Sequence, residues 1–429
     1  MFKNCVLEQS LQILGNAVTR QHHILTSDVK WQEVYELLKK NNVANCCYNY
    51  INSLPIEERP DDTLMNEWKN LDIYQNIRQL VKLNALMIVL KAALEKNIEL
   101  IIFKGIVLAD LYPCKTERVS SDTDILVQIK DVDEISRVLL DLGYLMKPQK
   151  ENVQVYVLPN KHIIELHTSL WEDYQGCIID KLEQLNLTQN SKLLSLTACG
   201  ISITTLGYTQ HLIYLIYHIV KHFCLEGTGI KCLLDISLYV NAWNDKINWT
   251  DFWLSMKSLQ YDQFCRKIFY LCGLYFGMKH VIDMVDYQLC EEEIEYLLRD
   301  FMLLTREELG EHKAEYEALR IVEPYFCDGK GILRNRMLLR LRFLFPIHFY
   351  EKKYQYANKN KLLLPVAWVE RAKHYRKRIK IEDKVSLNKK FNKAKQRIEM
   401  MELTGLIKFS KQVNFDNLRR KNGQGDRNL

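Results

Sequence analysis

Two aspartates in the stretch "SSDTDILVQI" have the type and spacing of side chains that bind a divalent cation. Asp122 and Asp124 stand at the start of an apolar run that predicts a β-strand, in which alternate side chains share a face. Two carboxylates this close repel each other unless they share a proton, meet a basic group or bind a cation. Carboxylate oxygens suit Mg²⁺, which keeps water and substrate phosphates in its remaining positions. The pair therefore predicts an Mg²⁺ site, with Mn²⁺ as the alternative ion.

A third acid, Glu165, lies in the short apolar run "HIIELH" between Ile164 and Leu166. A charge inside a strand is costly unless that face lines a site or meets water, so two interpretations stay open. Glu165 is either a third metal ligand or an edge-strand acid that faces solvent. The Asp-x-Asp spacing of Asp122 and Asp124 does not by itself indicate a metal site. Asp131 and Asp133 have the same spacing at the start of a predicted helix, where acidic side chains interact favourably with the helix dipole.

Residues that suit phosphate groups precede the two aspartates. Lys104 and Gly105 follow the apolar run "IELIIF"; glycine lets the backbone approach a phosphate closely, and lysine adds a point charge. Arg118 can clamp a phosphate with two hydrogen bonds, although a solvated loop arginine is an equally open interpretation. Ser120 and Ser121 offer short hydroxyl donors in the turn. The five residues predict a nucleotide-binding segment beside the metal site.

A second set of polar residues lies in the later stretch "YHIVKHF". His218, Lys221 and His222 stand one turn apart, so both imidazoles share a helix face. The spacing matches that of a zinc protease helix, but Ile219 replaces the glutamate that acts as its general base, which excludes that class. The histidines either line a cleft opposite the carboxylates or tie helices together through hydrogen bonds.

The period of the apolar residues changes along the chain. Up to about residue 98 they recur every three to four positions, which predicts helices. Short apolar runs at 98–103 and 124–129, and two more around the Pro-Asn turn of "VQVYVLPNKHIIELHTSL", predict strands. The stretch "DVDEISRVLLDLGY" predicts a helix between them, and beyond about residue 194 the helical period returns. The pattern indicates an α+β fold: a small mixed sheet with flanking helices, embraced by helical regions on both sides.

Composition and charge complete the organisation. The 429 residues, 48% hydrophobic and 26% charged, are typical of a globular protein, and no apolar run or leader predicts a membrane span or secretion. The twelve cysteines lack paired spacing, so we expect reduced thiols and a cytoplasmic location. Residues 330–429 hold 27 Lys and Arg against 8 Asp and Glu, while the remaining chain has a net charge of −13. This basic block is either a solvated helical face or a surface for phosphate-rich partners.

We expect four regions. They are an N-terminal helical region over 1–80, an α/β core over 81–194, a helical domain over 195–330, and a basic, mostly helical region over 331–429 with a disordered tail.

The stretches "FKGIVLADLYP", "ERVSSDTDILV", "HIIELH", "LIYHIVKHF", "GIKCLLDISLYV" and "LLLPVAWVERAKHY", taken in order, resemble the uncharacterised nucleotidyltransferase family of the polymerase-beta-like superfamily. The resemblance runs from about residue 80 to 380. Its most specific part is the order Lys-Gly, then Arg, then Asp-x-Asp followed by apolar residues. The wider superfamily has Gly-Ser where this chain has Lys104 and Gly105.

The resemblance implies a minimal nucleotidyltransferase fold, in which Asp122 and Asp124 match the metal-binding pair and Glu165 the third carboxylate. It also implies transfer of a nucleoside monophosphate from an NTP, ATP among them, to an acceptor hydroxyl with release of pyrophosphate. The family has a basic residue and an aspartate after its His-rich helix, and Lys231 and Asp235 match these as residues of the cleft.

Two functional hypotheses follow from the sequence. The first is an Mg²⁺-dependent nucleotidyltransferase acting on a small molecule, a sugar or a protein side chain. The second is a non-catalytic nucleotide-binding or scaffold protein, whose basic C-terminal region binds a phosphate-rich partner such as nucleic acid. The three carboxylates favour the first hypothesis, and the charge of residues 330–429 favours the second.

Overall fold

The computed structural model describes residues 5–20, 28–147, 153–159, 161–171, 179–225, 228–279, 288–303, 345, 354–382 and 400–406. The chain divides into two compact units, residues 1–316 and 317–429. The predicted disordered tail and most of the predicted basic region 331–429 lie outside the described residues. Among the described helices, none combines the length and apolar character needed to cross a membrane.

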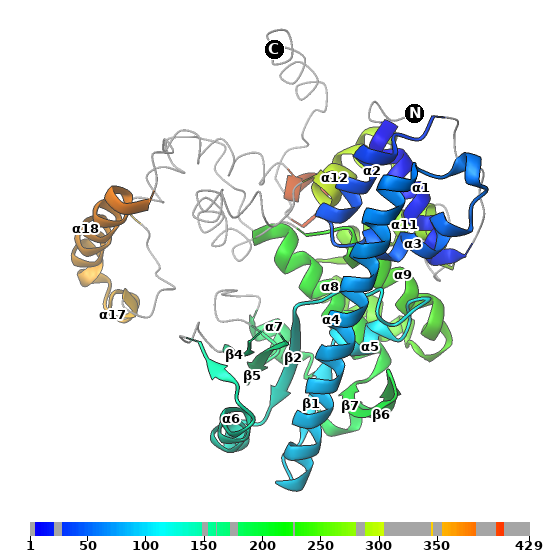
Figure 1. Ribbon diagram of the computed structural model, residues 1–429. Coiled ribbons are helices and arrows are strands. Elements are labelled where there is room, and N and C mark those ends of the chain that lie inside the picture. The colour runs from blue at the N-terminus through cyan, green and yellow to red at the C-terminus, as the bar shows by residue number, and fades with distance from the viewer. Residues whose placement is uncertain are drawn as a thin grey trace. The chain divides into compact units, whose positions relative to one another are not determined.

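A mixed seven-stranded sheet organises the first unit (Figure 1). Its strands are β1 Leu100–Phe103, β2 Asp122–Val127, β3 Leu145–Met146, β4 Val153–Leu158, β5 His162–His167, β6 Leu193–Ala198 and β7 Ile201–Leu206. Their spatial order is β3-β4-β5-β2-β1-β7-β6. The strand β2 lies between β1, to which it runs antiparallel, and β5, to which it runs parallel. The ends of β1, β2 and β5 therefore meet near the centre of the sheet.

Helices make up most of the rest of the first unit. They are α1 Cys5–Thr19, α2 Trp31–Lys40, α3 Ala44–Ser53, α4 Asp62–Glu95, α5 Gly105–Ala109, α6 Val132–Asp141, α7 Ile179–Gln184, α8 Tyr208–Leu225, α9 Lys231–Trp243, α10 Trp249–Leu259, α11 Asp262–Phe276 and α12 Glu291–Leu303. Short 3₁₀ turns are η1 Ile56–Glu58, η2 Ile129–Asp131, η4 Asn190–Lys192 and η5 Asn244–Lys246. In the second unit the structure describes α17 Gln355–Lys359, η7 Lys361–Leu363 and α18 Leu364–Glu382.

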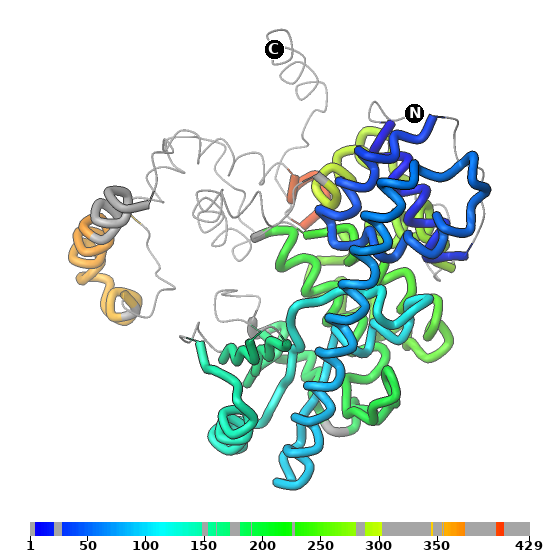
Figure 2. The backbone as a smooth tube through the Cα atoms, viewed as in Figure 1, coloured from blue at the N-terminus to red at the C-terminus, as the bar shows by residue number. Residues whose placement is uncertain are grey.

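The long helix α4 covers one face of the sheet. Its N-cap is Asp61, whose side chain accepts a hydrogen bond from the Leu64 amide at 2.9 Å. No glycine or proline interrupts the following 34 residues, and the inner side of the helix joins a buried core with β1, β2, β5 and α6. Leu86, Ile102 and Ile125 are each no more than 1% exposed in this core. Figure 2 shows the same chain path, with α4 in blue leading into the sheet.

The opposite face of the sheet belongs to the site. Strand side chains alternate between faces, so Ile102 and Ile125 pack toward α4 while Phe103 and Asp124 point to the other side. There the ring of Phe103 lies 5.1 Å from that of Tyr214 of α8. Two layers of helix thus enclose the sheet, and the carboxylate of Asp124 emerges on the α8 side.

The α+β class, the strands expected at 98–103, 124–129 and on both sides of the Pro-Asn turn, and the helix expected at 131–144 are confirmed. The expectation of helix directly beyond residue 194 is wrong, because β6 and β7 form a hairpin that extends the sheet beside β1. Its two turn residues, Cys199 and Gly200, have φ values of 53° and 81°, the left-handed pair of a two-residue hairpin turn. The alternation of "GISITTL" is the period of a strand, which the wide apolar helices that follow obscured.

Candidate active site

Strand register brings the predicted carboxylates together. The parallel pairing of β2 with β5 sets Asp124 opposite Glu165 and Asp122 opposite Ile163. Because side chains alternate along both strands, Asp122, Asp124 and Glu165 share one face of the sheet. His167, two residues beyond Glu165, points to that face as well.

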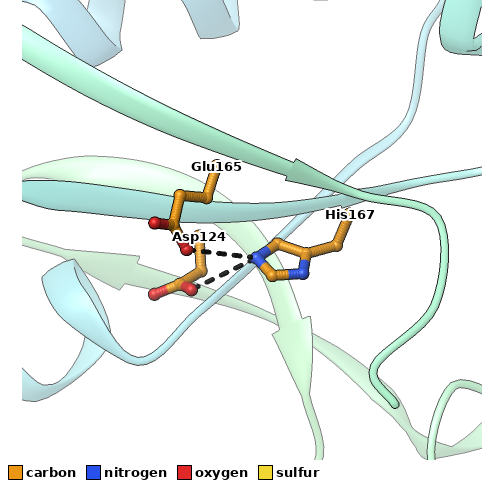
Figure 3. Close-up of side chains that lie close together, drawn as sticks. All are labelled: Asp124, Glu165 and His167. Carbon is orange, nitrogen blue, oxygen red and sulfur yellow. Dashed lines mark ion pairs between the residues drawn. The ribbon is translucent and has the colours of Figure 1, made fainter. Parts of the chain in front are cut away.

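Three of these side chains form a compact cluster of potential metal ligands (Figure 3). The Nε2 atom of His167 lies 3.3 Å from Oδ1 of Asp124 and 3.8 Å from Oε2 of Glu165. The ligand atoms of all three residues lie within 4.8 Å of one another. In the part of the chain that the structure describes, this is the group of ligand atoms close enough to hold one ion. Asp122 is not in the group and lies two residue pairs from it along the β2–β5 pairing.

Lys104 supplies a positive charge at the same place. Its Nζ lies 2.8 Å from Oδ1 of Asp124, and both side chains are almost buried. Burial by itself raises the pKa of the Asp124 carboxyl, but Lys104 and His167 outweigh burial and hold that pKa well below its usual range. Burial likewise lowers the pKa of Lys104, and the Asp124 carboxylate reverses this and holds it above its usual value. The ammonium group of Lys104 therefore neutralises one oxygen of the predicted metal-binding pair.

The residues nevertheless fit a divalent cation. Asp122, Asp124 and Glu165 bring three carboxylates to one face, against the single ammonium of Lys104. Burial, followed by the charges of Asp124 and Asp122, raises the pKa of the Glu165 carboxyl. A divalent cation would relieve the repulsion among these carboxylates. Carboxylate oxygens suit Mg²⁺ and Mn²⁺, and the imidazole of His167 is a ligand that transition metals accept more readily than Mg²⁺ does.

The backbone at Lys104 is unusual. Its φ of 56° is in the left-handed region, which costs a non-glycine residue free energy and is often found at functional sites. The amide of Lys104 donates a hydrogen bond to Nε2 of His211 at 3.1 Å. Burial, together with the charge of Lys104, lowers the pKa of His211 to about 3, so this ring is neutral at pH 7 and can accept that bond. His211 thus secures the strained turn between β1 and α5.

Arg118 lies directly behind this turn. It makes a two-point ion pair with Asp235 of α9, both contacts being 2.8 Å, and its Nη1 donates to the carbonyl oxygen of Gly105 at 3.2 Å. The hydroxyl of Tyr112 donates to Asp235 at 2.8 Å, and Nζ of Lys231 donates to the carbonyl oxygen of Val119 at 2.7 Å. The side chains of Arg118 and Asp235 are 7% and 9% exposed. This buried clamp joins α9 to the turn after β1 and to the segment that enters β2.

The other predicted phosphate ligands lie at the start of β2. Nζ of Lys82 on α4 contacts the hydroxyl of Ser120 and the carbonyl oxygen of Asp122. Ser120 also bonds through its backbone to Gln79, whereas Ser121 is exposed. Burial lowers the pKa of Lys82 to about 8. Lys82 therefore fixes the backbone that presents the first carboxylate.

The predicted histidines lie on the same face of α8 as Tyr214. Lys104 Nζ lies 5.6 Å from the centre of the Tyr214 ring, and the His218 ring stacks on that ring with a centroid distance of 6.2 Å. The rings of His218 and His222 are 4.3 Å apart in an edge-to-face contact. Lys221 and both histidines are half-buried. Tyr214, His218 and His222 thus form one face of α8, and Lys104 lies at the Tyr214 end of this face.

The structure therefore brings Lys104, Asp122, Asp124 and Glu165 to one place and gives Arg118, Lys231 and Asp235 partners within the protein. Their predicted roles with nucleotide, metal and acceptor stay predictions. Sequence reasoning missed His167, although its spacing of two from Glu165 on a strand was a usable signal. It also missed Lys82 and His211, which reach the site from helices far away in sequence and left no such signal.

Comparison with known proteins assigns the family. The model of the family described as "Uncharacterised nucleotidyltransferase" matches residues 27–277, more than half of the chain. The protein belongs to this family and is a nucleotidyltransferase. No curated protein sequence matches it.

Two solved structures of one protein are similar in part. The first is the solution structure of the antibiotic-resistance factor ANT(2'')-Ia, at 12% identity and a TM-score of 0.31, covering 41% of this chain and 89% of that one. The second is the crystal structure of ANT(2'')-Ia in complex with adenylyl-2''-tobramycin, at 13% identity and a TM-score of 0.24, covering 44% of this chain and 93% of that one.

Proposed function

We propose that the protein transfers a nucleoside monophosphate from a nucleoside triphosphate to an acceptor hydroxyl and releases pyrophosphate, with Mg²⁺ or Mn²⁺ as the required ion. The observation that supports this most is the register of β2 with β5, which sets Asp122, Asp124 and Glu165 on one face. The proposal includes a cytoplasmic location, which the free thiols of the described cysteines support.

Asp122, Asp124 and Glu165 are the residues that would hold the ion, and His167 stands beside them as a further ligand. Bound there, a divalent cation would neutralise phosphate charge and activate the attacking oxygen. The protein's task is then to position the groups in line and to stabilise the charge on the transferred phosphoryl group.

Lys104 has two uses in this scheme. Without nucleotide its ammonium group compensates Asp124, so that a buried carboxylate does not stand without a counter-charge. With a triphosphate present, the same ammonium group would contact phosphate oxygens, together with the main-chain N–H of Gly105. A Cβ atom at Gly105 would meet the carbonyl oxygen of Asp122 at 3.9 Å, an ordinary contact, so packing does not demand this glycine. Close approach of a phosphate group to the backbone would account for a glycine at position 105.

Glu165 is our candidate for the proton acceptor. Burial and its acidic neighbours raise its pKa, which makes the carboxylate a better base than an exposed glutamate. The acceptor's O–H bond would break with its proton going to Glu165, its oxygen would bond to the α-phosphorus, and the bond to the bridging oxygen of pyrophosphate would break. Arg118, Ser120 and Ser121 complete the proposed nucleotide segment; Arg118 acts through the Gly105 carbonyl rather than from a free side chain.

The acceptor is proposed as a small molecule, a sugar or a protein side chain. We assign its side of the site to the α8 face with His218, Lys221 and His222, because this face begins at Tyr214 in contact with Lys104. Lys231 and Asp235 act from behind, through the clamp on the segment that enters β2.

The experiment measures NTP binding and pyrophosphate release separately. Wild type and the variants Asp122→Asn, Asp124→Asn and Glu165→Gln are titrated with each NTP and Mg²⁺ or Mn²⁺ by calorimetry, and pyrophosphate release is followed with pooled small-molecule and protein acceptors. Asp133→Asn is the matched control, because it is an exposed acid of the same spacing at the start of α6. Loss of metal-dependent NTP binding in the site variants but not in the control supports the proposal. Equal binding in all of them contradicts it.

A further inference from the structure

The outer side of α4 is strongly apolar. Eight large hydrophobic side chains on this helix are exposed by 36% or more. They are Ile73 at 45%, Tyr74 at 57%, Ile77 at 57%, Leu80 at 52%, Val81 at 36%, Met87 at 50%, Ile88 at 50% and Leu94 at 75%. The inner side of the same helix is packed, with Leu86, Val89 and Ala93 each no more than 1% exposed. Contiguous apolar surface of this kind commonly marks an interaction site.

The spacing of the outer residues is that of a coiled-coil seam. Seven exposed positions follow one another at alternating steps of four and three residues: Ile73, Ile77, Leu80, Asn84, Met87, Lys91 and Leu94. This seven-residue repeat keeps a stripe of a helix facing one helical partner along its whole length. The seam covers 21 steps, or about 31 Å at 1.5 Å per residue. The spacing of the seam residues therefore indicates that the partner is a helix.

The seam is complementary to itself when reversed. If Asn84 lies on a two-fold axis, an antiparallel second copy brings Leu80 beside Met87 and Ile73 beside Leu94, each pair being level to within one residue, about 1.5 Å along the axis. Ile77 then meets the aliphatic stem of Lys91, and the two Asn84 amides face each other. The flanking residues Val81 and Ile88 fall opposite each other in the same arrangement. Such a match of one surface with itself is what a two-fold dimer requires.

Charge selects the antiparallel direction. A parallel pair in register would set Lys91 against Lys91, two like charges in an apolar seam. The antiparallel pair separates these ammonium groups by 14 residues along the axis, about 21 Å, which is beyond the screening length of about 8 Å at physiological salt. The amide of Asn84 at the centre costs some affinity and favours one register over others, as a buried polar residue does in coiled coils.

We propose that two copies of the chain form an antiparallel dimer through the α4 seam. This inference stands on the helix alone and does not depend on the proposed reaction. A standard interface buries about 800 Å² per partner, and a seam of only three heptads buries less than this. We therefore expect a dimer with a dissociation constant on the order of micromolar. The dimer is then populated at high protein concentration and dissociates on dilution.

Sedimentation equilibrium across a hundredfold range of concentration tests the proposal. Wild type should shift from monomer to dimer, and Leu80→Glu and Met87→Glu should each weaken the dimer at least tenfold. Ile56→Glu is the control, because Ile56 is an even more exposed apolar residue, at 81%, outside α4. Circular dichroism checks that every variant is folded. A monomer at all concentrations, or a dimer that Leu80→Glu leaves intact, overturns the proposal.

A mixing experiment tests the direction of pairing. Leu80→Glu and Met87→Lys should each be mainly monomeric alone, whereas an equimolar mixture should form a heterodimer, because position 80 of one copy faces position 87 of the other. In a parallel pair, position 80 of one copy would not face position 87 of the other. The mixture would then form no more dimer than each variant does alone. Failure of the mixture to recover a dimer would refute the antiparallel arrangement.

Discussion

The ammonium group of Lys104 lies 2.8 Å from Oδ1 of Asp124, so the most buried carboxylate of the proposed metal pair already carries a positive partner from the protein. A cation that approaches this oxygen competes with Lys104, and a triphosphate offers the displaced ammonium group a new partner. Metal and nucleotide should therefore bind more tightly together than either does alone.

Lys104→Met should destabilise the protein by roughly 3 kcal/mol without metal, because it leaves the Asp124 carboxylate buried with one cationic partner fewer. Mn²⁺ should offset more of this loss in the variant than it adds to wild type, since the ion no longer competes with the lysine. Thermal unfolding with and without Mn²⁺ measures both effects. Equal stabilisation of the two proteins by Mn²⁺ would show that Lys104 and the ion do not share Asp124.

Binding of Mn²⁺ should weaken as the pH falls through the raised pKa of Glu165, because a protonated carboxyl cannot ligate the ion. The loss should begin at a higher pH than for an ordinary glutamate, whose pKa is about 4.3. Electron paramagnetic resonance of free Mn²⁺ over pH 4 to 8 follows this in wild type and in Glu165→Gln. The variant should bind more weakly at pH 8 and show a flatter profile; parallel profiles would contradict a ligand role for Glu165.

Asp235→Asn should destabilise the protein by about 3 to 5 kcal/mol, since it leaves the buried guanidinium of Arg118 without its carboxylate. The double variant Arg118→Met/Asp235→Leu should recover much of this loss, because it removes both charges. Denaturant unfolding measures the free energies. For comparison, Glu33→Gln at the exposed pair with Lys30 should change stability by less than about 1 kcal/mol. Additive effects at Arg118 and Asp235 would argue against the clamp.

Glu117, next to the clamp, should make stability depend on pH. Burial raises the pKa of this carboxyl to about 7, so the folded state binds the proton more tightly than the unfolded state does. Its contribution is fully present below about pH 4.5 and is lost as the pH rises to about 7. The stability of Glu117→Gln relative to wild type should therefore rise between pH 5 and pH 8, by roughly 3 kcal/mol at most. The exposed Glu57→Gln variant should show no such trend, and a flat difference for Glu117→Gln would contradict the assignment.

The strands and the shared face of Asp122, Asp124 and Glu165 were predictable from the sequence, because a strand's two-residue period fixes the direction of each side chain. The apolar runs also located β1, β4 and β5. The local sequence pattern was sufficient to predict these features because neighbouring residues alone determine them.

The partners of these residues were not predictable in the same way. Arg118 meets Asp235 across 117 residues, and Lys104 meets His211 across 107. Such contacts depend on how α8 and α9 pack against the sheet, which no local period records. From its position four residues before Asp122, Arg118 could be a phosphate ligand or a buried structural residue. Only the residues around it in the folded protein distinguish the two roles.

The measurement that tests the central proposal most directly is Mn²⁺ binding in the presence of a non-hydrolysable NTP analogue, followed by electron paramagnetic resonance in wild type, Asp122→Asn/Asp124→Asn and Asp133→Asn. We expect wild type and Asp133→Asn to bind the ion in a manner that the analogue strengthens, and the double variant to lose both the binding and its dependence on the analogue. Binding that is unchanged in the double variant would contradict a metal–nucleotide site on the β2–β5 face.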